Sequence, residues 1–214
     1  MAMIQPKRAR LHLSLAQKII LINFLGWVFI YADRTILNPV MPEIQRSFGL
    51  NHAELGLISS VFLTYTVSQS PFSRLADDHS KKAIVALGFV FFAVMTFLSG
   101  IVPTFILFLL ARALVGLGQG SFYGPAYGLI NENLSDRHAT LGMAIINSGQ
   151  GVGQILGTLL ASTLVIQNQD HWSTPFLVIA LPTVMVGFLY LYGLPKESRS
   201  IRYGGKSVNA CGGQ

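Results

Sequence analysis

Charged residues are scarce in this sequence. They make up 11% of its 214 residues, whereas hydrophobic residues make up 51%. Soluble domains usually carry about 25% charged residues. The shortage of charge excludes an ordinary soluble domain and predicts that lipid surrounds much of the chain.

Cysteine and acidic residues are also rare. The single cysteine, Cys211, excludes an intramolecular disulfide. The excess of basic over acidic residues gives a formal charge of +6, yet the basic residues punctuate apolar segments instead of forming one cluster. Nucleic-acid binding needs a clustered basic footprint, so we expect no nucleic-acid partner. The first apolar segment is too long for a cleavable signal peptide and contains two charges, so it should remain as a helix.

Six apolar segments are long enough to cross a bilayer as helices. They are Ala16–Met41, His52–Leu75, Ala83–Val102, Thr104–Ile130, Ala139–Ile166 and Trp172–Leu194. This predicts an all-α, polytopic bundle of six transmembrane helices over residues 16–195. Residues 1–15 are expected to be a cytoplasmic tail and residues 196–214 a cytoplasmic, disordered tail. Pro42 is placed just beyond a span, and Pro71 and Pro125 within spans that they should kink.

The loop charges predict the orientation of these segments. Only Arg46 lies in the loops of one side, and Arg34 and Arg112 lie within spans. The other basic residues all flank the opposite side: Lys7, Arg8, Arg10, Lys18, Arg74, Lys81, Lys82, Arg137, Lys196, Arg199, Arg202 and Lys206. By the positive-inside tendency, both termini are predicted to be cytoplasmic, in a plasma or inner membrane.

Asp33 and Arg34 lie deep inside the first apolar segment. Arg34 is roughly 22 Å from the cytoplasmic boundary of the apolar core. The fourth segment enters from the other side, so Arg112 is roughly 12 Å below the outer boundary. In a core about 30 Å thick, the two arginines share a layer. Ionisable residues at this depth indicate a substrate or ion pathway. Two arginines and one aspartate leave an excess positive charge that a carboxylate or phosphate could neutralise. A structural pairing of Asp33 with Arg112 is the alternative.

Several motifs resemble the major facilitator superfamily. Residues 73–82, SRLADDHSKK, are similar to its loop after span two, Gly-x-Leu-Ala-Asp-Arg-x-Gly-Arg-Lys, although serines replace both glycines and Asp78 replaces the arginine. Arg112 followed by Gly116 and Gly118 resembles the Arg-x-x-x-Gly-x-Gly segment of span four. The YADR sequence at residues 31–34 resembles the first span of organic anion:cation symporters and spinster-like transporters, and HWSTPF at 171–176 the start of span six.

The resemblance covers residues 15–195 and implies one half of a twelve-helix fold. Family members hold their substrate between two six-helix halves near the membrane midplane. It therefore implies a secondary active transporter, or the N-terminal half of one. Such a protein would move a small organic anion by alternating access, coupled to protons. The partner would be a C-terminal half or a second copy. A non-transporting fragment or a regulatory half that associates with another membrane subunit is the alternative.

The predicted site combines these arguments. Asp33 is the proton-coupling residue, and the gating loop contains Asp77, Lys81 and Lys82. The predicted substrate-binding residues are Arg34, Arg112, Tyr31, Tyr65, Gln69, Gln119, Tyr123, Asn147 and Gln150. No metal or organic cofactor is implied. Every histidine falls in a loop or at the end of a span, where it could not activate a serine inside the membrane, so an intramembrane enzyme is not expected.

Glycines recur at four-residue spacing in two spans. One row is Gly116, Gly120 and Gly124, and the other is Gly149, Gly153 and Gly157. Small residues let membrane helices approach closely. These rows predict either tight packing within the bundle or a sliding contact with a partner half.

Overall fold

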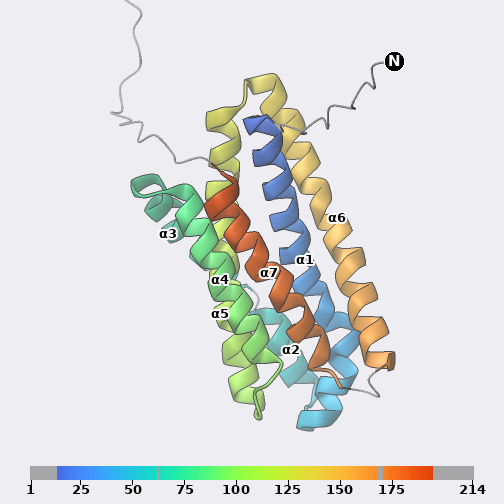
Figure 1. The fold of residues 1–214 in the computed structure, drawn as a ribbon. Helices are drawn as coiled ribbons and strands as arrows, with labels where there is room; N and C mark the ends of the chain where they lie inside the picture. Colours follow the sequence, from blue (N-terminus) through green and yellow to red (C-terminus); the bar gives the residue numbers. More distant parts are fainter. Residues whose placement is uncertain (1–13, 62, 168–170, 195–214) are drawn as a thin grey trace, which may run out of the picture.

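The computed structural model describes residues 14–61, 63–167 and 171–194. In these ranges the chain forms seven helices and no strand (Figure 1). They are α1 (Leu15–Phe48), α2 (His52–Val61), α3 (Thr64–Asp78), α4 (Lys81–Ser99), α5 (Phe105–Asn133), α6 (Asp136–Gln167) and α7 (Thr174–Gly193). The all-α class predicted from the sequence is confirmed.

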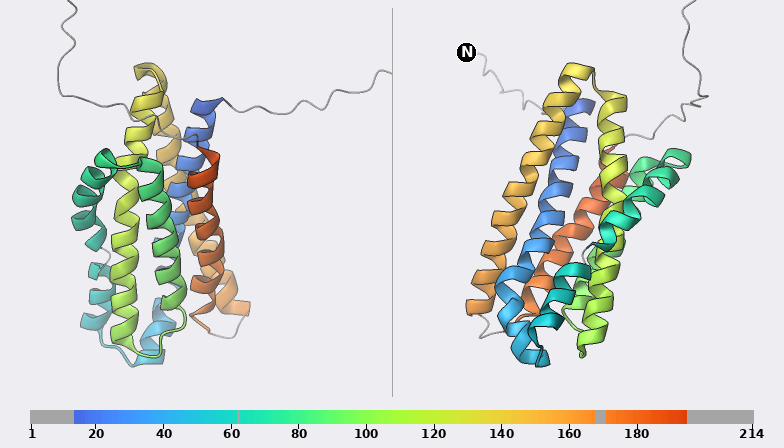
Figure 2. Two further views of the ribbon diagram at one scale, coloured as in Figure 1. Left: turned by 60° about the vertical axis from the view of Figure 1, so that its left-hand side comes forward. Right: turned by 180° about the vertical axis from the view of Figure 1, so that it is seen from behind.

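The chain passes six times from one end of the bundle to the other. Five of them, α1, α4, α5, α6 and α7, are each long and apolar enough to span a membrane. The sixth crossing is made by α2 and α3 in succession (Figures 1 and 2). The start of α1, the end of α7 and the α3–α4 and α5–α6 connections lie at the same end of the bundle, which is called the terminal end below.

The second predicted span is not one helix. It divides into α2 and α3, because the backbone N–H of Leu63 donates to Ser60 O at 3.0 Å and that of Thr66 donates to Leu63 O at 3.0 Å. This three-residue spacing is tighter than an α-helical turn. The Thr64 hydroxyl then donates to Ala113 O at 2.9 Å and anchors the start of α3 on α5. The prediction of a continuous helix here was wrong, and the break precedes Pro71.

The first helix is longer than predicted. It continues past Met41 to Phe48, so that Pro42 lies inside α1 and not beyond its end. Gly49 terminates it in the left-handed conformation, with φ of 64°, which glycine adopts without steric cost. At 34 residues and 1.5 Å per residue, α1 is about 51 Å long. It must therefore extend beyond a hydrocarbon core about 30 Å thick.

Both glycine rows pack inside the bundle. A Cβ on Gly149, Gly153 or Gly157 of α6 would collide with backbone oxygens of α1, those of Phe24, Val28 and Ala32 respectively. On α5, a Cβ on Gly120 or Gly124 would collide with the side chains of Ser68 or Ser73 on α3. The structure therefore matches the prediction of close packing, with these faces already covered by neighbouring helices.

Two apolar clusters fill the bundle, one toward each end. The cluster nearer the terminal end contains Trp27, Phe89 and Phe122, and the other contains Ile36, Phe108 and Phe176. On α1 the clusters meet between Ile30 and Ala32. Asp33 and Arg112 therefore lie where the two apolar clusters adjoin.

Candidate functional site

Asp33 and Arg112 form a completely buried ion pair. Arg112 Nη1 lies 3.5 Å from Asp33 Oδ2, and neither side chain has exposed surface. The Thr96 hydroxyl donates to Asp33 Oδ1 at 2.8 Å, and Arg112 Nε donates to Ser99 Oγ at 3.0 Å. These contacts join α1, α4 and α5. They compensate two charges that would be very unfavourable in an apolar environment if left alone.

Arg34, the next residue, has a different environment. Its guanidinium carbon lies 4.1 Å from the centroid of the Tyr65 ring, 5.2 Å from that of Tyr31 and 5.8 Å from that of Tyr123. We call these three residues the tyrosine cage. Arg34 is half-buried. The site therefore contains a cation that is surrounded by aromatic rings and is still partly exposed.

Gln119 connects the two charged residues of α1. Its Oε1 accepts a hydrogen bond from Arg34 Nε at 2.9 Å, and its Nε2 donates to Asp33 Oδ2 at 3.0 Å. The side chain is completely buried, so these bonds are not in competition with water. A single amide thus contacts both the half-buried arginine and the buried carboxylate.

The remaining predicted binding residues lie on α3 and α6. Asn147 on α6 is exposed and accepts a hydrogen bond from Tyr127 Oη at 2.7 Å. Gln69 is half-buried on α3, one turn beyond Tyr65, and Gln150 is half-buried on α6. The structure therefore brings together Asp33, Arg34, Arg112, Gln119 and the tyrosine cage, whereas Gln69, Asn147 and Gln150 form none of the contacts described for that group.

The predicted gating loop lies at the terminal end of the bundle. Lys81 Nζ lies 3.7 Å from Asp77 Oδ1 and also pairs with Glu132 at the end of α5. Lys82 Nζ donates to Leu194 O at 3.2 Å, just beyond α7. The start of α4 is therefore fastened to the ends of α3, α5 and α7. Glu132 was not predicted, because its partner is about fifty residues distant in sequence.

Four further residues of the site were missed by sequence reasoning. Thr96 and Ser99 hydrogen-bond to the ion pair. The centroid of the Phe176 ring lies 4.7 Å from the guanidinium carbon of Arg112. Trp27 contacts the cage, with its ring centroid 5.0 Å from that of Tyr123 and 5.5 Å from that of Tyr31. Trp27 offered a sequence signal, since it lies one helical turn before Tyr31, and Phe176 belongs to the HWSTPF motif but was not predicted to lie at the site.

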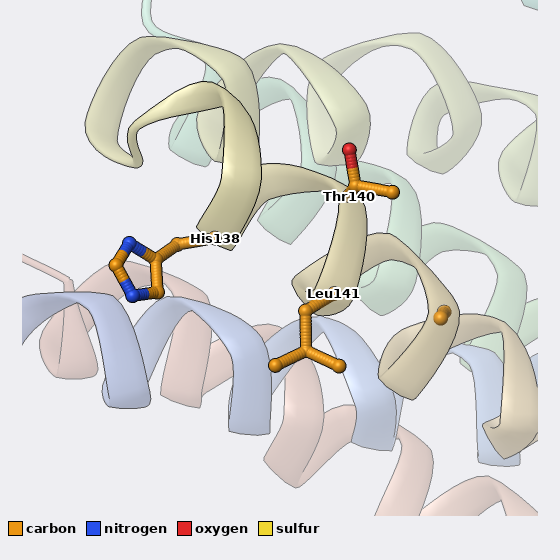
Figure 3. Close-up of a pocket in the computed structure, with 4 residues that line it drawn as sticks. His138, Thr140 and Leu141 are labelled. Carbon is orange, nitrogen blue, oxygen red and sulfur yellow. The ribbon is translucent and has the colours of Figure 1, made fainter.

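A separate hollow of about 870 Å³ lies near the start of α6. It is lined by His138, Thr140, Leu141 and Ala144, the first three of which are labelled in Figure 3. The layer of Asp33 lies much farther along α6, where Thr35 of α1 donates to Gln154 O at 3.3 Å. From His138 to Gln154 is about 24 Å of helix. This hollow is therefore distinct from the charged site.

A bundle of membrane-spanning helices around a buried charged layer defines an integral, multi-pass membrane protein of the transporter class. The sequence matches the family model described as Major Facilitator Superfamily over residues 24–208. This chain belongs to that family. The family and its curated relatives are transporters, not enzymes.

Curated relatives include transporters of different named substrates. The chain is 30% identical over 178 residues to the mouse sphingosine-1-phosphate transporter SPNS2, covering 82% of this chain and 32% of the relative. It is 28% identical over 174 residues to the cis,cis-muconate transport protein of Acinetobacter baylyi, covering 80% of this chain and 41% of the relative. The chain thus spans about a third to two fifths of the length of these relatives.

Solved structures give the same fold. A bacterial homolog of the human lysosomal transporter Spinster, in an inward-facing and unoccupied conformation, superposes with a TM-score of 0.75 at 19% identity. The match covers 89% of this chain and 47% of that one. An inward-facing, occupied structure gives 0.76 at 22% identity, covering 81% and 43%. The bundle therefore has the fold of about half of a major facilitator transporter, as the sequence predicted.

Proposed function

We propose that this bundle is the N-terminal half of a secondary active transporter in which Arg34 binds a small organic anion and Asp33 carries a coupled proton. The observation that carries the proposal is the environment of Arg34. Its guanidinium is half-buried in the tyrosine cage, 4.1 Å from the centroid of the Tyr65 ring, and lies outside the Asp33–Arg112 pair. A planar guanidinium held in this way suits carboxylate and phosphate groups equally.

The burial of the two arginines supports different roles for them. Arg112 has no exposed surface and is paired with Asp33, whereas Arg34 is half-buried and lies outside that pair. Of the two predicted anion ligands, this favours Arg34 for direct contact with substrate. Arg112 then serves as the counterion of Asp33.

The relatives support a substrate whose anionic group is either a phosphate or a carboxylate. The printed names of two of them refer to sphingosine-1-phosphate and to cis,cis-muconate, a phosphate monoester and a dicarboxylate. Both classes present an anionic group that a guanidinium can bind through two parallel hydrogen bonds. We therefore propose an organic anion whose charged group binds Arg34 and whose apolar part contacts the tyrosine cage.

Gln119 provides a route for coupling anion and proton. In the present state its Oε1 accepts a hydrogen bond from Arg34 Nε, and its Nε2 donates one to Asp33 Oδ2. An anion that draws Arg34 away would free Oε1, and rotation of the amide would then let this oxygen accept a hydrogen bond from a protonated Asp33. Anion binding and protonation would favour each other, which is the linkage a symporter requires.

Alternating access requires a second bundle against which this one rocks. We propose that the second bundle is a C-terminal half of the same type or another copy of this chain. With both termini cytoplasmic, the terminal end of the bundle would face the cytoplasm.

The anion site can be tested by fluorescence of Trp27. In a Trp172→Phe background, the indole of Trp27 reports on the cage, since its ring lies 5.0 Å from that of Tyr123. Titration with a dicarboxylate and with an alkyl phosphate should change its emission saturably. Arg34→Gln should abolish the change, whereas Arg46→Gln, which removes an exposed cation with 72% side-chain exposure, should preserve it. An equal response in the Arg34→Gln protein would refute Arg34 as the anion ligand.

A further inference from the structure

A groove separates α1 from α7 at the terminal end of the bundle. It has a volume of about 360 Å³ and is lined by Leu15, Lys18, Tyr192, Gly193 and Leu194. The two helices approach closely here, because a Cβ on Gly193 would lie 2.8 Å from Ile22 Cδ1. The start of α1 and the end of α7 lie side by side in both Figure 1 and Figure 2.

The groove is electropositive. Lys18 is exposed, and the described residues that line the groove include no aspartate or glutamate. Its α1 wall is the first turn of that helix, where the helix dipole favours an anion. On the α7 side, Lys82 donates to Leu194 O at 3.2 Å and so offsets the negative end of the α7 dipole. Two ammonium groups therefore lie in or beside this groove.

An apolar stripe leads from the groove along α7. Tyr192 is 83% exposed, and Phe188, Met185 and Leu181 are 47%, 61% and 73% exposed. The Tyr192 and Phe188 rings stack, with centroids 6.4 Å apart. The spacing of these four residues places them on one face of the helix. The stripe therefore begins at an interfacial tyrosine and continues for about 16 Å toward the membrane centre.

We propose that this groove binds an anionic phospholipid, with the phosphate beside Lys18 and an acyl chain along the α7 stripe. A cation, an interfacial aromatic ring and an apolar track occur here in the order in which a lipid presents its phosphate, its glycerol region and its chains. This surface lies away from the charged layer and does not depend on the transported substrate. The ligand would be a resident of the leaflet that contacts the terminal end.

Native mass spectrometry of the purified chain can test this site. Phosphatidylglycerol and phosphatidylcholine with identical acyl chains would be added separately to the detergent-solubilised protein, and the bound fraction compared. We expect phosphatidylglycerol to be retained in preference. Lys18→Gln should reduce this preference by about fivefold, the effect of one cation near an anionic headgroup. Arg74→Gln removes an exposed cation from the same end but outside the groove, and should leave the preference unchanged.

Two additional measurements locate the lipid. Glycerol 3-phosphate in excess should not displace phosphatidylglycerol, because it lacks the chains that contact the stripe. Brominated phosphatidylglycerol should quench the indole introduced by Tyr192→Trp, in a background that lacks Trp27 and Trp172, more strongly than brominated phosphatidylcholine. Equal loss of preference in Lys18→Gln and Arg74→Gln would show diffuse attraction to charge. That result, or equal quenching by the two lipids, would overturn the proposal.

Discussion

Asp33 and Arg112 face each other across the bundle, with Oδ2 and Nη1 3.5 Å apart and no exposed surface on either side chain. Removing one partner would leave the other charge buried and uncompensated, which typically costs about 3–5 kcal/mol. Replacing both together leaves no uncompensated charge, although the donors Thr96 and Gln119 lose Asp33 as their acceptor. The pair therefore predicts strong coupling between the two positions.

We expect Arg112→Met and Asp33→Leu, each alone, to lower the thermal stability of the detergent-solubilised protein severely. The double substitution should be more stable than either single one. A double-mutant cycle on the apparent melting temperature checks this. Simple additivity of the two effects would show that the pair is not an energetic unit.

Arg34 offers a contrasting prediction about binding. Arg34→Lys keeps the positive charge but loses both the planar stacking over Tyr65 and the hydrogen bond from Nε to Gln119. A loss of about 1.4 kcal/mol would weaken anion binding about tenfold. We expect this in the Trp27 fluorescence titration, with little change in the yield of folded protein. A parallel loss of yield would instead indicate that Arg34 mainly supports folding.

The α1–α6 interface predicts the effect of a single added methyl group. Gly153→Ala places a Cβ against the backbone oxygen of Val28, which cannot move aside as a side chain could. Overpacking of this kind costs about 1–3 kcal/mol. Gly151→Ala is the matched control on the same helix, because a Cβ there meets nothing within 4 Å. We expect a lower melting temperature for the first variant only, and equal melting temperatures would contradict the packing described.

Much of this arrangement could be predicted from the sequence. Charges in an apolar segment must be compensated, so the sequence alone indicated a shared layer of Asp33, Arg34 and Arg112. Depth counted along two antiparallel helices placed these residues at the same level. The tyrosines at positions 31, 65 and 123 were likewise predicted to lie near the site, and the structure places all three around Arg34.

Other features leave little trace in sequence. The division between α2 and α3 was missed, because hydrophobicity averaged over a window of about nineteen residues hides a tight turn whose hydrogen bonds span three residues. Thr96 and Ser99 looked like ordinary polar residues of an apolar helix, since such hydroxyls commonly hydrogen-bond to the backbone one turn earlier. Their role depends on which face of α4 packs against α1 and α5, and that is decided by the whole bundle.

The orientation in the membrane is a separate prediction. Lys18 lies near the start of α1, Arg74 near the end of α3, and Lys81 and Lys82 at the start of α4, all toward the terminal end of the bundle. The positive-inside tendency therefore predicts that this end faces the cytoplasm. A reporter fused after Gln214 should therefore be cytoplasmic, and one inserted near Gln169 should be on the opposite side. Protease protection of both fusions in sealed vesicles checks this, and the reverse pattern would invert the orientation.

Gln119 allows the proposed coupling to be separated from anion binding. Gln119→Leu removes both hydrogen bonds, from Arg34 Nε and to Asp33 Oδ2, while leaving Arg34 in the tyrosine cage and Asp33 beside Arg112. If the amide links the two sites, anion binding should persist in this variant but lose its dependence on pH. In a complete transporter that contains this bundle, accumulation against a gradient should fall much more than downhill exchange. Thr64→Val, which removes the hydroxyl bond to Ala113 O at the start of α3, is a control that alters a polar contact outside this link. If Gln119→Leu retained a wild-type pH profile and full accumulation, the proton and the anion would have to communicate by another route. The rotation of this amide would then have no part in transport.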